Sequence, residues 1–331
     1  MFTDKTILIT GGTGSFGQKC TKKLLGTYKP KKVIIFSRDE YKQFEMSKKF
    51  PIKQYPCIRY FLGDVRDKER LYRALSGVDY ILHAAALKQI PATEYNPFEA
   101  IKTNILGASN IINAAIDQGV KKVIALSTDK AANPVNLYGA TKLCSDKLFI
   151  AGNAYVGRDQ TTFSVVRYGN VVGSRGSVIP FFLNKRKEGK LTVTDKRMTR
   201  FWITLDQSVQ FALENFSRMV GGEIFVPKLP SMRIMDLAYS ICPECEIKFI
   251  GIRPGEKIHE VLISADDARN TIEFDTFYII KPHFKYFERR FHEEGGKQVP
   301  ETFEYNSKNN SHWLDSNQLM EYIKYSFTPI E

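Results

Sequence analysis

The sequence lacks any apolar run that approaches the roughly 20 residues of a membrane-spanning helix. It also lacks room for a secretory signal, because an apolar strand pattern, TILIT at 6–10, begins within a few residues of Met1. Only five cysteines occur in 331 residues, and an odd number spread this thinly argues against a secreted disulfide framework. These absences predict a cytoplasmic protein that does not associate with membranes.

Metal and redox motifs are also scarce. Only Cys242 and Cys245, in the segment CPEC, have suggestive spacing. A zinc site would usually need a second Cys/His pair, and a thioredoxin-like motif would follow the first strand of its fold. We therefore expect ordinary loop or core cysteines and no metal site.

Basic residues are in excess, but no long basic stretch is interleaved with aromatic residues. Lys and Arg number 48 against 36 Asp and Glu, which gives a formal net charge of +12. Scattered basic residues suit an enzyme whose substrate and cofactor carry phosphates better than a nucleic-acid binder. With 43% hydrophobic and 25% charged residues, the composition is that of a soluble globular protein of enzyme size.

The first half of the chain alternates short β-branched runs with helical patterns. The runs are TILIT, KVIIFS, RYFLGD, DYILHAA and KKVIALS, and one long helix is expected at about 97–118. Short apolar runs separated by helices are typical of a parallel sheet covered on both faces. The sequence therefore predicts an α/β fold with a Rossmann-like, doubly wound parallel sheet.

The alternation ends after SVVRYGNVVG, and a mixed pattern follows with helices expected near 235–240 and 257–262. We expect a smaller C-terminal α/β lobe that binds substrate. The expected division is a nucleotide-binding domain at 1–171, with 203–227 packing back on it, a substrate lobe at 172–202 and 228–290, and a C-terminal extension at 291–331.

A glycine-rich turn, ITGGTGSFGQK, follows the first strand directly. Gly11, Gly14 and Gly17 permit a tight turn and let backbone N–H groups approach a pyrophosphate at the helix N-terminus. Ser37 and Arg38 end the second strand, where an NAD-binding fold often has a carboxylate, and a guanidinium suits the 2′-phosphate of NADP. NADP is therefore the expected cofactor.

Other cofactor contacts are expected at the ends of the first six strands. Small residues end the fourth strand, as if a ligand passes close by. His83 in that strand is expected to be a packed core histidine and not a catalytic residue. The remaining expected cofactor residues are Thr13, Ser15, Phe16, Asp39, Lys42, Asp64, Val65, Ala84, Ala86, Lys88, Tyr138, Lys142 and Val171.

Tyr138 and Lys142 are four residues apart on an expected helix, so they share a face. A lysine ammonium and a nicotinamide cation beside the phenol would bring the pKa of tyrosine from about 10 toward neutrality. Tyr138 would then act as a base for a sugar or alcohol hydroxyl.

These motifs resemble the extended short-chain dehydrogenase/reductase family. Within it, the chain is similar to the inverting UDP-N-acetylglucosamine 4,6-dehydratases that begin pseudaminic acid biosynthesis. The motifs that carry the likeness are GGTGSFG, SRDE, GDVRD, HAAALK, STDKAANPVNLYGATK, RYGNVVGSRGSVIPFF, MTRFWIT, GGEIFVP and IRPGEK. They cover nearly the whole chain and are weakest in the last ~40 residues.

Asp129 and Lys130 would supply a second acid/base pair beside Tyr138 and Lys142. In the implied cycle Tyr138 deprotonates the C4 hydroxyl while hydride passes to NADP. Lys130, if neutral, then takes the C5 proton, and Asp129, if protonated, helps the C6 hydroxyl leave as water. Hydride returns to C6, and protonation of C5 from the opposite face inverts the sugar.

The resemblance also implies a substrate side and an assembly. The expected substrate residues are Lys88, Thr128, Asn170, Ser177, Thr194, Met198, Arg200, Arg253 and Glu256, with Arg253 suited to phosphate oxygens. The family likeness implies a homo-oligomer built from dimers, up to a hexamer, with helices at about 97–118 and 138–150 as the dimer surface.

Three alternatives share parts of this pattern. A UDP-sugar 4-epimerase has the same fold and the Tyr138/Lys142 pair but does not need Asp129 and Lys130. Retaining dehydratases of the large membrane-anchored type carry Met in place of Tyr138 and have transmembrane helices. A non-catalytic NADP-binding regulator would not need intact catalytic residues.

Overall fold

The computed structural model describes residues 1–157, 160–172, 178–283 and 295–327. Over these residues the largest element is a ten-stranded sheet in the order β16-β14-β15-β10-β6-β5-β4-β1-β2-β3. Its parallel strands are β1 (Thr6–Thr10), β2 (Lys32–Ser37), β3 (Ile58–Leu62), β4 (Tyr80–His83), β5 (Lys122–Leu126), β6 (Thr162–Val166) and β10 (Ile224–Pro227). Within these parallel strands the order β3-β2-β1-β4-β5-β6 runs outward from β1 in both directions, which is the expected doubly wound order.

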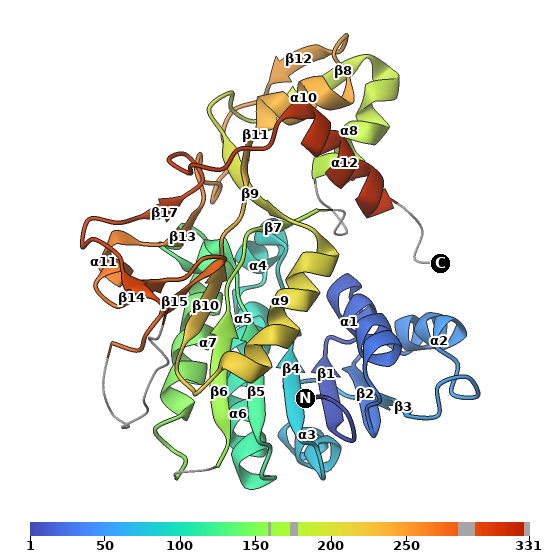
Figure 1. Ribbon diagram of the computed structural model, residues 1–331. Helices are drawn as coiled ribbons and strands as arrows, with labels where there is room; N and C mark the ends of the chain where they lie inside the picture. The colour runs from blue at the N-terminus through green and yellow to red at the C-terminus, as the bar shows by residue number, and fades with distance from the viewer. Residues whose placement is uncertain (158–159, 173–177, 284–294, 328–331) are drawn as a thin grey trace.

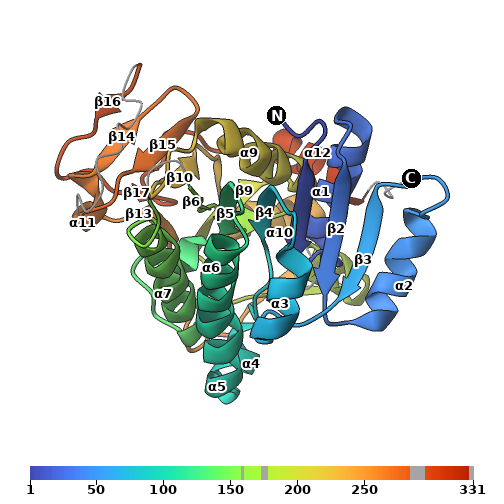
Figure 2. The same cartoon turned by 90° about the horizontal axis from the view of Figure 1, so that it is seen from below.

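Helices cover both faces of this sheet (Figure 2). On one face lie α3 (Lys68–Leu75), α6 (Gly107–Asp117) and α7 (Leu137–Gly152), and on the other lie α1 (Ser15–Thr27) and α9 (Leu205–Arg218); α2 (Glu40–Lys49) follows β2. The central strands are buried along their length, which explains their continuous apolar runs. The predicted Rossmann-like fold is confirmed.

The long helix expected at about 97–118 is present as three joined helical segments. They are α5 (Pro97–Ile101), a π-helical segment (Lys102–Leu106) and α6, preceded by α4 (Ile90–Tyr95). Buried Asn104 in the π-helical segment bonds the backbone of Leu87, which follows β4. The irregular turn therefore holds the loop after β4, where the sequence placed Lys88.

A smaller lobe lies beyond the carboxyl ends of the parallel strands (Figure 1). It has its own apolar core, centred on Phe182, Trp202 and Leu237. Its elements are α8 (Val178–Lys185), a 3₁₀ turn (Arg186–Glu188), β8 (Lys190–Val193), α10 (Ile234–Ile241), β12 (Glu246–Phe249) and α12 (Ser316–Phe327). A three-stranded sheet of β7 (Asn170–Val171), β9 (Thr199–Ile203) and β11 (Ser231–Arg233) connects this lobe to the large sheet.

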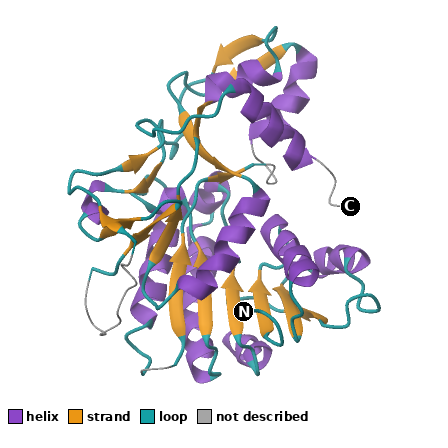
Figure 3. Cartoon of the chain, viewed as in Figure 1, coloured by secondary structure: helices purple, strands orange, loops and turns teal. Residues whose placement is uncertain are grey.

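The division of the chain differs from the expected one after residue 260. The strands β14 (Thr271–Glu273), β15 (Phe277–Ile280) and β16 (Lys297–Gln298) extend the large sheet in antiparallel fashion, whereas the sequence assigned 228–290 to the substrate lobe. The expected extension at 291–331 contributes Leu319 of α12 to the core of the lobe. Figure 3 distinguishes strands from helices by colour in the same view as Figure 1.

The helix expected at 257–262 is not formed. Residues Val261–Ile263 form β13, which pairs with β17 (Tyr305–Asn306) and is followed by the short α11 (Ala265–Ala268). Leu262 and Ile263 are buried against the large sheet, and that burial outweighs the helical spacing of this short segment.

The cysteines at the end of α10 also differ from expectation. Cys242 and Cys245 form a disulfide rather than remaining separate core residues.

In the described residues no group of three His, Cys, Asp or Glu side chains could hold a metal ion. No helix of those residues is both long and apolar enough to cross a bilayer.

Candidate active site

A cavity of ≈ 990 Å³ opens between the large sheet and the smaller lobe. The segments that follow β1, β2, β3, β4, β5 and β6 form its floor, because the carboxyl ends of parallel strands meet at one edge of a sheet. Every predicted site residue lines this cavity except Gly17, which is buried in α1, and Ser177, which lies outside the described residues.

The turn after β1 depends on residues without side chains. Gly11 has φ +62°, and a Cβ there would come 3.0 Å from the backbone of Ala85 in the loop after β4. A Cβ on Gly17 would come 2.3 Å from the carbonyl oxygen of Gly12, so Gly17 packs α1 onto the turn instead of lining the cavity. The first turn of α1 has no side-chain cap, which leaves its N-terminus suited to an anion.

Arg38, Asp39 and Lys42 lie at the end of the cavity beside β2. Arg38 is half exposed, and its Nη1 lies 3.6 Å from Oδ2 of Asp64. Asp39 accepts a hydrogen bond from the backbone N of Lys42 and pairs with its Nζ, so it caps α2. The Ser37 hydroxyl accepts a hydrogen bond from Gln43, which leaves its own proton to be donated.

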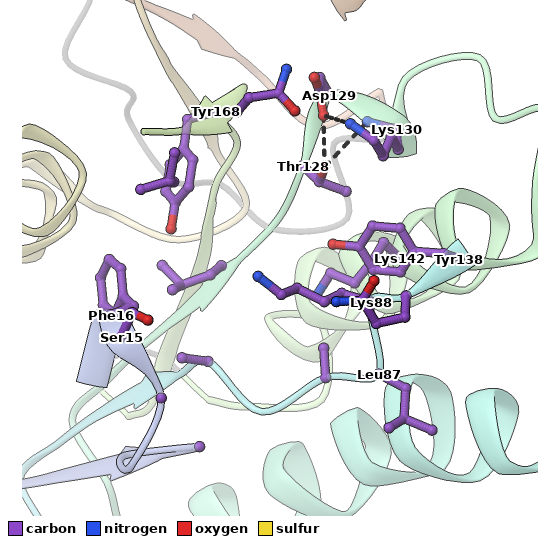
Figure 4. Close-up of a pocket in the computed structure, with 18 of the residues that line it drawn as sticks. Ser15, Phe16, Leu87, Lys88, Thr128, Asp129, Lys130, Tyr138, Lys142 and Tyr168 are labelled. Carbon is purple, nitrogen blue, oxygen red and sulfur yellow. Dashed lines mark hydrogen bonds and ion pairs between the residues drawn. The ribbon is translucent and has the colours of Figure 1, made fainter. Parts of the chain in front are cut away.

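Tyr138 and Lys142 project from the first turns of α7, which Asn136 caps through a 2.8 Å hydrogen bond from the N of Gly139. Figure 4 shows both side chains in the cavity beside Lys88. Burial of Lys88 and the charge of Lys130 lower the pKa of Lys88. Burial raises the pKa of Tyr138 to about 12, although the charge of Lys130 and a hydrogen bond with Thr128 oppose this.

The sequence predicts that Lys142 and a nicotinamide ring lower the pKa of Tyr138, and the protein groups alone do not bring it toward neutrality. Burial of the phenol outweighs the nearby positive charge, and the cation that lowers the pKa is Lys130, not Lys142. Burial lowers the pKa of Lys142 itself, and Asp146 opposes that shift.

Asp129 and Lys130 lie in a 3₁₀ turn (Asp129–Ala131) directly after β5. Nζ of Lys130 lies 3.0 Å from Oδ1 of Asp129, and the Thr128 hydroxyl donates to the same oxygen at 2.8 Å (Figure 4). The Asp129 side chain is only 1% exposed, so this is not a solvated surface ion pair. Its other oxygen, Oδ2, is buried without a hydrogen-bond partner.

Gly139 lies where the Tyr138–Lys142 pair on α7 meets the Asp129–Lys130 pair in the 3₁₀ turn. It lies one residue after Tyr138, and a Cβ at this position would come 2.1 Å from the carbonyl oxygen of Lys130. The 3₁₀ turn that carries Asp129 and Lys130 can therefore rest directly on the backbone of α7.

The sequence did not predict Glu260, a second carboxylate beside Lys130. Oε1 of Glu260 lies 3.5 Å from Nζ of Lys130, and Glu260 is 3% exposed. Burial lowers the pKa of Lys130, but the charges of Asp129 and Glu260 outweigh it and raise that pKa overall. These two charges favour the ammonium form of Lys130 in the resting protein, whereas the sequence-based mechanism needs the neutral amine when the C5 proton is taken. Sequence spacing could not have indicated this contact, because Glu260 precedes β13 in a segment that is neither helix nor strand.

The remaining predicted substrate residues that the structure describes belong to β7, β9 and the segments that follow β8 and β12. Nδ2 of Asn170 is buried without a hydrogen-bond partner. Arg200 donates to the backbone carbonyls of Thr199 and Ile258, and Arg253 lies at the rim 3.8 Å from Glu256. Thr194 and Met198 form part of the wall contributed by the lobe. Buried His83, in contrast, bonds Thr10 and belongs to the core, as predicted.

The doubly wound sheet, the glycine turn and the Tyr-x-x-x-Lys pair together define a short-chain dehydrogenase/reductase of the extended type. The chain belongs to the polysaccharide biosynthesis protein family, whose model matches residues 7–282. The resemblance to the inverting UDP-N-acetylglucosamine 4,6-dehydratases is confirmed at high identity. A Campylobacter jejuni protein of that name is 57% identical, over 98% of this chain and 99% of its own length.

Other relatives carry different names. A UDP-glucose 4-epimerase of Rickettsia akari is 43% identical, over 93% of this chain and 92% of its own length. The X-ray structure of Pen from Bacillus thuringiensis has a TM-score of 0.89 and 39% identity, with 98% of each chain covered. DesIV, a dTDP-glucose 4,6-dehydratase from Streptomyces venezuelae, has a TM-score of 0.69 and 24% identity over 76% of this chain and 86% of its own, which shows the shared fold.

Proposed function

We propose that this protein converts UDP-N-acetylglucosamine to UDP-2-acetamido-2,6-dideoxy-β-L-arabino-hex-4-ulose by 4,6-dehydration with inversion at C5. The observation that carries the proposal is the buried Asp129–Lys130 pair, which lines the same cavity as Tyr138 and Lys142. Oxidation at C4 needs one acid/base group, whereas dehydration also needs groups for the C5 proton and the C6 hydroxyl. The name of the Campylobacter relative supports this substrate.

The residues around the glycine turn fit a nicotinamide dinucleotide. The close approach of Gly11 to Ala85 and the uncapped start of α1 suit a pyrophosphate, and Ser37 and Arg38 suit the 2′-phosphate of NADP. When bound, NADP would accept hydride from C4 of the sugar and later return hydride to C6. It also carries a positive nicotinamide ring, which would favour the Tyr138 phenolate.

Oxidation at C4 would depend on Tyr138. Its phenolate takes the proton of the C4 hydroxyl, while buried Lys142 orients the reacting groups from the same face of α7. The charge of Lys130 lowers the cost of forming the phenolate, and burial raises it. The 4-keto group formed in this step acidifies the C5 hydrogen.

Elimination would use the second pair. Transfer of one proton across the 3.0 Å hydrogen bond from Lys130 to Asp129 gives the neutral amine and the carboxylic acid together, without a change in net charge. Lys130 then takes the C5 proton, and Asp129 gives a proton to the departing C6 hydroxyl. In this proposal the ammonium form of Lys130, which the two neighbouring carboxylates favour, is the resting state of the pair.

Incubation with UDP-N-acetylglucosamine in deuterated water, followed by NMR, tests the function. We expect loss of the C6 hydroxyl, deuterium at C5 and the L-arabino configuration. The 43% identity to a UDP-glucose 4-epimerase makes epimerisation the second candidate. A product changed only at C4, with no deuterium at C5, would establish that second activity.

The cofactor preference gives a separate prediction. Arg38→Asp should weaken NADP binding by about 10- to 100-fold and shift the preference toward NAD, because hydrogen bonds to a charged group contribute about 1.5–3 kcal/mol. Lys48→Asp is a matched control, since Lys48 carries the same charge on α2 but pairs with Glu45 outside the cavity. Isothermal titration with both nucleotides measures the change. Equal NADP affinity in the parent and Arg38→Asp would contradict this placement of the 2′-phosphate.

Assembly, location and pathway extend the proposal. Exposed Tyr95, Phe98 and Leu106 lie along α4, α5 and the π-helical segment, which supports a dimer-based homo-oligomer formed through these helices. We propose a cytoplasmic enzyme of surface-sugar biosynthesis, with a pseudaminic acid route as the specific expectation.

A further inference from the structure

Lys130 contacts carboxylates from two distant parts of the chain. Asp129 belongs to the same 3₁₀ turn, whereas Glu260 directly precedes β13. Nζ of Lys130 lies 3.0 Å from Oδ1 of Asp129 and 3.5 Å from Oε1 of Glu260. Each carboxylate also has one buried oxygen without a hydrogen-bond partner. An amine held between two desolvated carboxylates is restricted in position far more than one on the surface.

Glu260 is itself fixed by the C-terminal part of the chain. Its backbone N donates to the Ser307 hydroxyl at 2.9 Å, and the N of Ser307 donates to the carbonyl of Glu260 at 2.8 Å. The Ser307 hydroxyl also bonds Thr199, which contacts His259. The carboxylate beside Lys130 therefore rests on a buried network that includes β9 and the segment after β17.

The other charges around Lys130 are mostly positive. Nε of Arg200 lies 3.6 Å from Oε1 of Glu260, and Nζ of Lys257 donates to the carbonyl of Ala132 at 2.6 Å. Arg200, Lys257 and Glu260 line a second cavity of ≈ 160 Å³ together with Lys130. This cavity shares Lys130, Asn170, Arg200 and Glu256 with the main cavity. The titratable and charged groups that face Lys130 are Lys88, Asp129, Tyr138, Arg200, Glu256, Lys257 and Glu260. Glu260 thus offsets a surplus of cations on the side of Lys130 that faces the lobe.

We infer that Glu260 is a positioning residue for Lys130, holding its amine at the junction of the two cavities and linking it to Arg200 on the substrate side. This inference rests on the proposed function for its catalytic meaning, because Lys130 is there the group that exchanges a proton with C5. The ion-pair geometry itself does not depend on which sugar is bound. Glu260 acts through Lys130 and does not need to touch the substrate.

Competitive acetylation with acetic anhydride, read by mass spectrometry, tests the inference without turnover. The reagent attacks only neutral amines, so the rate at a given pH reports the neutral fraction of each lysine. Loss of a carboxylate beside a cation shifts a pKa by about 1–3 units, so Glu260→Gln should acetylate Lys130 at least about 10-fold faster at pH 9. Lys185, which pairs with Glu188 in the lobe, is the internal reference.

Two further variants separate charge from general disruption. Glu260→Asp keeps the charge and should return the acetylation rate toward that of the parent. Glu246→Gln removes an exposed carboxylate from Lys190 and should leave Lys130 unchanged. Equal acetylation of Lys130 in the parent and Glu260→Gln would overturn the inference, as would equal acceleration by Glu260→Asp and Glu260→Gln.

The apparent pKa of Lys130 can also be measured by acetylation of the parent protein, so this test does not depend on whether a variant folds. Lys130 of the parent protein should acetylate with an apparent pKa above the ordinary value of about 10.4, and a value below that would also overturn the inference. With substrate, the pH profile of C5 deuterium exchange in Glu260→Gln should move about 1–3 units toward acid. If the parent does not turn over UDP-N-acetylglucosamine at all, the proposed function fails, and the acetylation rates still decide the role of Glu260.

Discussion

Lys130→Ala is expected to lower formation of the dehydrated product by about 10²- to 10⁴-fold, the usual cost of losing a general base. The main loss should fall on elimination, because Lys130 lies in the turn after β5, whereas the groups for C4 oxidation lie on α7. C4 oxidation should lose only the help that the charge of Lys130 gives to the Tyr138 phenolate. Deuterium uptake at C5 should fall with product formation. The near-ultraviolet absorbance of reduced nicotinamide should still appear in a single turnover.

Lys147→Ala is the matched control, since Lys147 is exposed on α7. Asp129→Asn keeps the shape of the other member of the pair and should slow loss of the C6 hydroxyl more than C5 exchange. If Lys130→Ala exchanges C5 at near the parent rate, the Asp129–Lys130 pair has no catalytic role and the epimerase proposal gains support.

Tyr138→Phe is expected to stop the reaction earlier. It removes only the phenol oxygen, yet C4 oxidation should fall by about 10²- to 10⁴-fold because no other group is proposed to take the C4 hydroxyl proton. Single-turnover absorbance should show no reduced nicotinamide, and C5 exchange should be absent because the 4-keto group is not formed.

Tyr155→Phe makes the same chemical change at an exposed position and should behave as the parent. Reduced nicotinamide formed at the parent rate in Tyr138→Phe would remove this tyrosine from the mechanism. The two predictions together distinguish oxidation from elimination, because each variant should stop the cycle at a different step.

The parallel part of the large sheet could be predicted because its central strands are buried on both faces and are therefore continuous apolar runs. TILIT and KVIIFS each became a buried strand at the expected place. The segment after Lys257 could not be predicted in the same way, since VLI is too short for its periodicity to distinguish a strand from a helix. Its structure depends on pairing with Tyr305 and Asn306, which are more than 40 residues further along the chain.

The site shows the same division between local and distant signals. Residues that follow a strand, such as Arg38, Asp129 and Asn170, could be placed in one cavity because parallel strands bring their carboxyl ends together. Glu260 could not, because its contact with Lys130 spans 130 residues of sequence and is created by the β13–β17 pair and Ser307. That contact helps to raise the pKa of Lys130. The Ser-Thr-Asp-Lys motif alone therefore could not predict the charge that Asp129 and Lys130 carry in the resting protein.

The absent side chain of Gly139 has a consequence for how the enzyme could move. The carbons to be oxidised and deprotonated, C4 and C5, are bonded neighbours in the sugar, so the groups that act on them must keep a fixed spacing throughout the cycle. With the Lys130 carbonyl 2.1 Å from where a Cβ would stand, the turn after β5 and the start of α7 are in direct backbone contact and form one rigid block. Closure of the lobe over a substrate would change the surroundings of this block. It would not change the distance between the Asp129–Lys130 pair and the Tyr138–Lys142 pair. A single methyl group at residue 139 would force them apart, and the two half-reactions would then lose their shared alignment on one sugar ring.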